Sequence, residues 1–181
     1  MPGQYDENVF FIGDFDDSLE NTVIIPLTQE IAKQSEKREG RIDLHINSCG
    51  GYLHLVNHMT ELVEIAKSNG VVVRTIVPDI AFSAGSMLAI TGTKGERYIG
   101  RRAEHLIHYG QIMSFETTEE QIDRFSAHKK RIFKGNYDHY VKYCDVPNLS
   151  QKMLDDGFFV TAAQAIKWGM ADKYMEKLDL K

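Results

Sequence analysis

Short apolar segments alternate with longer amphipathic ones along most of this chain, and this alternation predicts an α/β fold. Val9–Ile12, Arg41–Ile46 and Val71–Val77 are either continuously apolar or alternate between apolar and polar residues, which is typical of buried strands. Shorter apolar segments at 97–99 and 105–108 predict two more strands. Because the strands alternate with helical segments, we expect a parallel sheet wrapped by helices.

Helical spacing of apolar residues predicts two helices that pack on this sheet. In the segment 52–68 the apolar side chains share one face, and Gly70 ends the pattern. The segment 84–90 is small and apolar enough to form a buried helix.

The segment that follows the first strand has two interpretations. A helix that opens at Asp16–Leu19 and continues toward Lys33 fits the apolar spacing, although Pro26 interrupts or redirects it. Alternatively, Thr22–Ile25 forms a brief strand.

Two capping boxes mark the helices of the C-terminal half. Thr117–Glu120 matches the first and predicts a long, charged helix that reaches about Tyr143. Thr161–Gln164 matches the second, before a short helix that ends near Gly169. The long helix is too polar for the main core, so we expect it to project or to pack against another subunit.

Composition narrows the class of protein. The chain has 181 residues and a formal net charge of −5, with 43% apolar and 26% charged residues, which is ordinary for one soluble globular domain. The net acidity argues against nucleic acid or an anionic membrane as a partner. We find neither an apolar signal region nor a membrane-span-length run, and Cys49 and Cys144 suggest no disulfide framework. We therefore expect a cytoplasmic protein.

A hydroxyl, an imidazole and a glycine turn together indicate an acyl-transfer site. Ser83 stands just before the buried helix, His108 follows it along the chain, and the Gly50–Gly51 turn precedes both. Such a turn exposes the Ser83 hydroxyl and directs the Ala84 N–H toward a developing oxyanion, to which the glycine turn can add a second N–H. On local sequence alone, Ser83 could instead have only a structural role, as a small side chain that lets the buried helix pack closely against its neighbours.

A metal site is a weaker interpretation. His54 and His58 share a helical face with Glu61, but the His-Glu-x-x-His pattern is lacking. His45 and His105, on strands beside the proposed site, are interpreted as packing or hydrogen-bonding residues. We therefore expect no metal.

The order of six segments resembles a known family. These are Phe11–Asp17, Ile42–Gly51, Ile80–Gly85, Gly92–Tyr98, Leu106–His108 and Phe159–Asp172. In the same order and at matching spacing, they are similar to six segments of the Clp protease family. These are the entry strand, the "YINSPGG" segment, the nucleophile turn, and the "GAKGKRF", "MIH" and "FMSAEEAKEYGLID" segments. That family of self-compartmentalising serine peptidases belongs to the larger crotonase-like fold. The resemblance covers nearly all of Val9–Met175.

The resemblance implies a fold, a domain organisation and an activity. The fold is α/β, with repeated β-β-α (strand–turn–helix) units wound into a superhelical core and a protruding helical handle. Residues 1–181 form one peptidase domain, with a head at about 1–108 and 149–181 and a handle at about 109–148. The activity is that of a serine endopeptidase without a cofactor, which acts on unfolded polypeptides or peptides inside an oligomeric chamber.

The resemblance also implies roles for the site residues. Ser83 is the nucleophile, His108 the general base and acid, and the N–H groups of Gly51 and Ala84 the oxyanion hole. Substrate binds as an added strand beside the glycine segment, with Gly50 and Tyr52 as substrate-binding residues.

This chain departs from the family pattern at two positions near the site. The family's aspartate aligns with Met153, and a small gap brings Asp155 or Asp156 into register. Phage-type members carry an acid at the offset of Asp155, which we favour as the third catalytic residue. Cys49 replaces the usual proline before Gly50, and we expect it to be a small buried side chain rather than a reactive thiol.

The family forms heptameric rings, usually stacked in pairs, and receives substrate from an AAA+ ATPase. The resemblance therefore implies a homo-oligomer with such a partner, although ring stacking is less secure because the segment after His108 is poor in glycine. Two alternatives stay open: a catalytically impaired scaffold subunit that pairs with an active paralogue, and a crotonase-like acyl-CoA enzyme. Processing of a phage head protein also stays open as a role.

Overall fold

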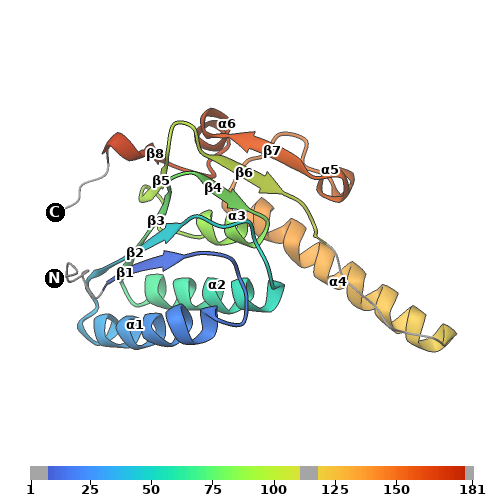
Figure 1. The fold of residues 1–181 in the computed structure, drawn as a ribbon, viewed down its shortest axis with the longest axis horizontal. Coiled ribbons are helices and arrows are strands. Elements are labelled where there is room, and N and C mark those ends of the chain that lie inside the picture. Colours follow the sequence, from blue (N-terminus) through green and yellow to red (C-terminus); the bar gives the residue numbers. More distant parts are fainter. Residues whose placement is uncertain (1–7, 111–117, 178–181) are drawn as a thin grey trace.

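A computed structural model describes residues 8–110 and 118–177 and has two sheets with helices around them (Figure 1). The larger sheet is parallel throughout, in the order β1-β2-β3-β5-β8. Its strands are β1 (Val9–Ile12), β2 (Arg41–Ile46), β3 (Val72–Val77), β5 (Arg97–Ile99) and β8 (Lys173–Tyr174). The parallel sheet expected from the sequence is therefore confirmed for this layer.

A smaller sheet has the order β4-β6-β7. β4 (Ile80–Phe82) runs parallel to β6 (Glu104–Ile107), and β7 (Phe158–Thr161) runs antiparallel to β6. The expected parallel pairing does not hold for β6 and β7, which are joined by the segment that contains α4 and α5 and pair in opposite directions. β3, β4 and α3 form one of the expected β-β-α units.

Six α-helices lie within the described ranges. They are α1 (Ile25–Lys37), α2 (Leu53–Ser68), α3 (Ala84–Ala89), α4 (Glu119–Tyr143), α5 (Gln151–Asp156) and α6 (Ala162–Lys167). A π-helical turn at Glu20–Ile24 leads into α1, and a 3-10 turn at Met175–Lys177 follows β8. The alternative strand at Thr22–Ile25 is wrong, and helical structure begins at Glu20 rather than at Asp16. Pro26 lies in the first turn of α1, directly after the π-helical turn.

α3 is the most deeply buried helix, since all six of its residues are buried. It lies between α2 and the smaller sheet, as Figure 1 shows. Small residues let it fit there: a Cβ added at Gly85 would lie 3.1 Å from the Ser48 Cβ. The prediction of a buried helix in this segment is confirmed.

α4 leaves the rest of the molecule as a long arm (Figure 1). Only Asn136 and Tyr140 are buried along its 25 residues, as its polarity predicted. Its capping box uses Thr118 and Gln121, one residue later than expected. Thr117 lies outside the described residues, together with the rest of the segment 111–117.

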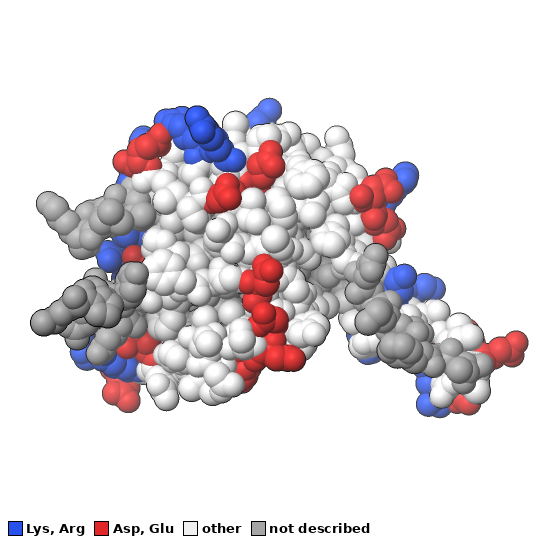
Figure 2. Space-filling model, in the orientation of Figure 1, with Lys and Arg blue, Asp and Glu red and all other residues white. Residues whose placement is uncertain are grey.

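Charge is unevenly spread over the face shown in Figure 2. Acidic side chains are scattered across its centre, while basic ones gather at its rim and on α4. None of the helices within the described residues has the length and apolar character that crossing a membrane would require.

Candidate active site

Ser83 occupies a strained turn between β4 and α3. Its φ of 52° and ψ of −116° are unusual for a residue with a side chain, and such strain costs about 1–3 kcal/mol. The backbone holds this conformation from both sides, because the Ser83 N–H donates to the Leu106 carbonyl (2.8 Å) and the Ser83 carbonyl accepts from Met87 N–H (3.0 Å). The half-buried hydroxyl is thereby presented at the N-terminus of α3.

The Gly50–Gly51 turn approaches Ser83 more closely than any side chain would permit. A Cβ added at Gly50 would lie 2.7 Å from the Ser83 Cβ, and one at Gly51 would lie 2.3 Å from the Phe15 carbonyl oxygen. Both glycines also have positive φ, 109° and 134°. Glycine is therefore required at both positions.

Two backbone N–H groups near the Ser83 hydroxyl have no hydrogen-bond partner among the described residues. Phe15 donates to the Gly50 carbonyl (2.7 Å) and accepts from the Tyr52 N–H (2.7 Å), so the N–H of Gly51 between them points the other way. The Ala84 N–H begins α3 and is likewise unpaired within the described chain. These are the two donors that the sequence assigned to an oxyanion hole.

Asp14 and Ser48 support this turn, and the sequence analysis missed both. The Asp14 carboxylate accepts the Cys49 N–H (2.6 Å) and the Ser48 hydroxyl (3.4 Å), and the Ser48 hydroxyl accepts the Gly50 N–H (3.0 Å). Both residues stand in segments that the sequence had singled out, but neither carries a motif signal for such hydrogen bonds.

His108 lies at the end of β6, half-buried, and its Nδ1 accepts the Gly110 N–H (3.0 Å). Since Nδ1 is an acceptor in this contact, the neutral ring carries its proton on Nε2. Burial lowers the pKa of His108. Among the described residues no hydrogen bond joins His108 to Ser83, and no carboxylate contacts the ring.

Asp155 and Asp156 are both exposed on α5, a helix that contacts the segment directly after β6. The Leu154 carbonyl accepts the Tyr109 N–H (3.0 Å), and Asp155 contributes to a raised pKa of Tyr109 after the larger effect of burial. Asp156 instead pairs with Lys152 at 2.9 Å. The structure thus brings Asp155 near the residue that follows His108, but not onto the imidazole.

One cavity of about 350 Å³ collects most of the predicted site residues. Its lining comprises Cys49, Gly51, Tyr52, Leu53, Ser83, Ala84, Met87, His108, Tyr109, Gly110 and Asn136. Gly50 lies behind Ser83 rather than in the lining. The expectation that Cys49 is buried is wrong: its side chain is exposed, because the turn presents it at the cavity.

A second serine and histidine contact each other beneath the cavity. Ser86 and His105 are fully buried, and the Ser86 Oγ lies 3.0 Å from His105 Nδ1. Burial lowers the pKa of His105 to about 4, so the ring is neutral near pH 7. This confirms that His105 is a hydrogen-bonding residue, and Ser86 is not part of the cavity lining.

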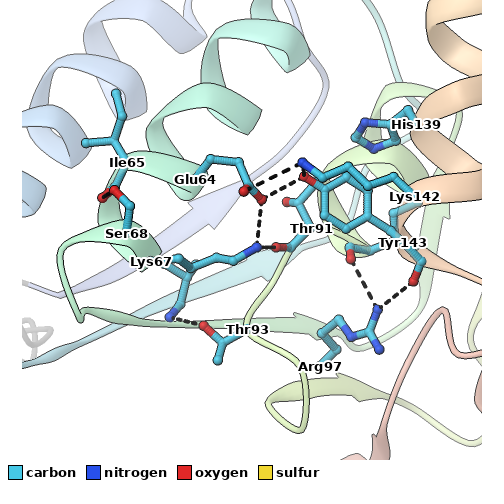
Figure 3. A network of polar contacts seen from close by, with 12 residues as sticks. Glu64, Ile65, Lys67, Ser68, Thr91, Thr93, Arg97, His139, Lys142 and Tyr143 are labelled. Carbon is cyan, nitrogen blue, oxygen red and sulfur yellow. Dashed lines mark hydrogen bonds and ion pairs between the residues drawn. The ribbon is translucent and has the colours of Figure 1, made fainter.

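The last turns of α4 are tied to the helices behind the cavity. His139 Nε2 lies 2.9 Å from the Met87 carbonyl oxygen on α3. Figure 3 shows how Lys142 and Tyr143 converge on Glu64 of α2, with the Tyr143 hydroxyl donating to the carboxylate at 2.6 Å. The Arg97 guanidinium donates to the Tyr143 carbonyl (3.2 Å). The base of the projecting helix is therefore fixed relative to α3.

The alternative metal site finds no support. No group of three potential ligands that could hold a metal occurs within residues 8–110 and 118–177. His45 lies elsewhere, with its ring 5.1 Å from that of Phe11.

Comparisons with known proteins agree with this geometry. The Clp protease family model matches residues 4–178. A Streptococcus mutans protein named ATP-dependent Clp protease proteolytic subunit is 27% identical over 97% of this chain and 88% of its own length. Proteins of the same name from Streptococcus uberis and Streptococcus pyogenes are 26% and 24% identical over the same shares.

Proposed function

Since the chain belongs to the Clp protease family, we propose that it is a serine-type proteolytic subunit that hydrolyses polypeptides through an acyl-enzyme on Ser83. The observation that carries this proposal is the shared cavity. Ser83, His108 and the unpaired N–H groups of Gly51 and Ala84 all line it. A nucleophile, a base and two oxyanion donors are the groups that acyl transfer needs.

The chemistry follows from these groups. His108 accepts the Ser83 proton while Oγ forms a bond to the peptide carbonyl carbon, and the oxyanion rests on the Gly51 and Ala84 N–H groups. His108 then gives that proton to the leaving amine as the C–N bond breaks. Water, deprotonated by the same imidazole, cleaves the acyl-enzyme and regenerates the Ser83 hydroxyl.

Acting as a base requires an unprotonated Nε2 on His108. The active site therefore has to move the ring proton to Nδ1, which ends the contact with the Gly110 N–H. Asp155 is the carboxylate we assign to receive that Nδ1 proton in a hydrogen bond, since Asp156 pairs with Lys152. Movement of α5 toward His108 would complete the triad.

Substrate binding as an added strand fits the backbone beside the cavity. Because Phe15 bonds to the residues on either side of Gly51, the Gly51 N–H stays available to an extended peptide. Tyr52, 51% exposed at the cavity lining, is positioned to cover such a peptide.

The assembly belongs to the same proposal. We propose a homo-oligomeric ring that encloses the cavities, with residues 1–181 as one domain and α4 as its handle. The relatives are named ATP-dependent, and this chain has no nucleotide motif, so a separate AAA+ ATPase would supply any ATP hydrolysis. A cytoplasmic location stays a prediction.

The experiment that tests this function is hydrolysis of an unfolded protein by the purified full chain, followed by gel and mass spectrometry. We expect fragments from the wild type and none from Ser83→Ala. Equal cleavage by both would contradict the assignment.

One observation favours a second candidate, a scaffold subunit that is catalytically impaired. His108 contacts a backbone N–H instead of a carboxylate, and that arrangement does not support a base. Mixing the chain with an active Clp subunit and measuring the mass of the complex tests this candidate. Mixed rings, together with no cleavage by this chain alone, would favour it.

A further inference from the structure

Asn136 is a buried polar residue whose side chain has no hydrogen-bond partner among the described residues. It is 6% exposed, lies on α4 and lines the same cavity as Ser83. Buried polar side chains in folded proteins are nearly always hydrogen-bonded. The Asn136 amide is not one of the fully buried polar groups that lack a partner, so it opens into the cavity, where a ligand can exchange hydrogen bonds with it.

Contacts between α4 and α3 relate Asn136 to the nucleophile Ser83. Asn136 stands one helical turn before His139, which contacts the Met87 carbonyl of α3. Met87 is in turn one helical turn after Ser83, to whose carbonyl it donates. Met87 and Asn136 line the same cavity as Ser83, so both are walls that the side chain of the attacked residue can meet.

The other walls of this part of the cavity restrict what such a side chain can be. Leu53, Met87 and Tyr109 provide apolar surface. The described residues of the lining include no Asp, Glu, Lys or Arg, and burial lowers the pKa of the one histidine there, His108. A charged substrate side chain would therefore lose its hydration without gaining an ion pair, which is costly.

We propose that Asn136 is a specificity-determining residue that selects glutamine as the residue whose carbonyl Ser83 attacks. This inference rests on the proposed peptidase function. The methylene groups of glutamine pack on Met87 and Leu53, and its amide exchanges hydrogen bonds with the Asn136 amide, each acting as donor and acceptor. Methionine fills nearly the same volume, but leaves Asn136 unpaired.

Three reporter peptides that differ only at this residue test the proposal with the full chain. They carry glutamine, methionine or glutamate, which are close in size and differ in hydrogen bonding and charge. We expect kcat/KM for glutamine to exceed that for methionine by about tenfold or more, because a buried amide without a partner is costly. Glutamate should be cleaved more slowly than glutamine by a similar factor.

Asn136→Leu removes the amide at nearly constant volume and should reduce the glutamine-to-methionine ratio to about one or below. Asn57→Leu, on the exposed face of α2, is the matched control and should keep the wild-type ratio. The fraction of chains that form a fluorophosphonate adduct gives the concentration of active sites in each preparation. A wild type that forms the adduct but shows no glutamine preference, or an unchanged ratio in Asn136→Leu, would overturn this inference alone. A wild type without any adduct would overturn the proposed function and this inference with it.

Discussion

Ser86 Oγ on α3 and His105 Nδ1 on β6 lie 3.0 Å apart in the protein interior; Ser83 directly precedes this helix and His108 directly follows this strand. Each partner is three residues from a site residue: Ser86 follows Ser83, and His105 precedes His108. The buried contact thus fixes α3 against β6 directly beneath the cavity. Since both side chains are out of reach of solvent, this hydrogen bond cannot be replaced by water.

Ser86→Ala should therefore destabilise the fold. The substitution removes the partner of His105 Nδ1, while His105 Nε2 is already unpaired among the described residues. We expect the free energy of unfolding to fall by about 1–3 kcal/mol in urea titrations. Ser68→Ala, at an exposed position on α2, should change it by less than about 0.5 kcal/mol. Equal effects of the two substitutions would show that the buried contact is not stabilising.

His105 should also make stability depend on pH. Burial lowers its pKa from 6.5 in the unfolded chain to about 4 in the fold, so between these values the unfolded state binds more protons. The contribution of His105 to the free energy of unfolding is fully present above pH 6.5 and is lost as the pH falls toward 4. About 2 kcal/mol of it is lost between pH 7 and 5. His105→Gln, which cannot be protonated, should flatten the pH dependence of the unfolding free energy over this range.

An exposed substitution that changes no titratable group provides the control for this titration. Ser68→Ala should leave the pH dependence of unfolding as it is in the wild type. If His105→Gln has the same slope as the wild type, the neutral buried His105 is not the source of the acid sensitivity.

Two adjacent acids provide a matched test of the third catalytic residue. Asp155→Asn should reduce kcat/KM for a peptide by roughly 10⁴-fold, because His108 would lose the group that holds its proton on Nδ1. Asp156→Asn removes only an exposed pair with Lys152 and should alter the rate less than about threefold. A larger loss from Asp156→Asn than from Asp155→Asn would reverse the assignment.

The close approach of Gly50 to Ser83 predicts a severe effect of one methyl group. In Gly50→Ala the new Cβ would lie 2.7 Å from the Ser83 Cβ at a backbone φ of 109°, so the turn and its Gly51 N–H have to move. We expect a loss of at least about 100-fold in kcat/KM, comparable to the removal of an oxyanion donor.

Gly135→Ala is the control, since a Cβ there meets nothing within 4 Å on a regular helix. It should keep wild-type activity and stabilise α4 by about 0.5–1 kcal/mol. Wild-type kcat/KM in Gly50→Ala would contradict the assignment of this turn to the oxyanion hole.

The elements with strong hydrophobic periodicity were predictable from the sequence. β1, β2 and α2 begin and end within one residue of the expected bounds, because one face of each is buried and the pattern reflects that burial. β4 was missed, since its three residues were interpreted only as part of the nucleophile turn. β7 was missed for another reason: its pairing partner β6 is far away in the sequence, so the antiparallel pair depends on how distant elements pack.

The site was only partly predictable, for a related reason. Ser83 and Gly51 occupy turns whose residue types are dictated locally, so short motifs revealed them. Asp14 contacts the Gly50 turn from a distant segment, and Asn136 reaches the cavity from a helix that is polar almost throughout. Neither contact leaves a periodic signal, because each depends on how two elements pack together.

The measurement that tests the central claim most directly is intact-mass spectrometry after incubation with a fluorophosphonate, on the wild type and on Ser83→Ala. The reagent reacts with a serine hydroxyl that a neighbouring base activates. We predict one adduct on the wild type and none on Ser83→Ala. No adduct on the folded, assembled wild type, or an adduct that persists in Ser83→Ala, would contradict the assignment of Ser83 as the nucleophile.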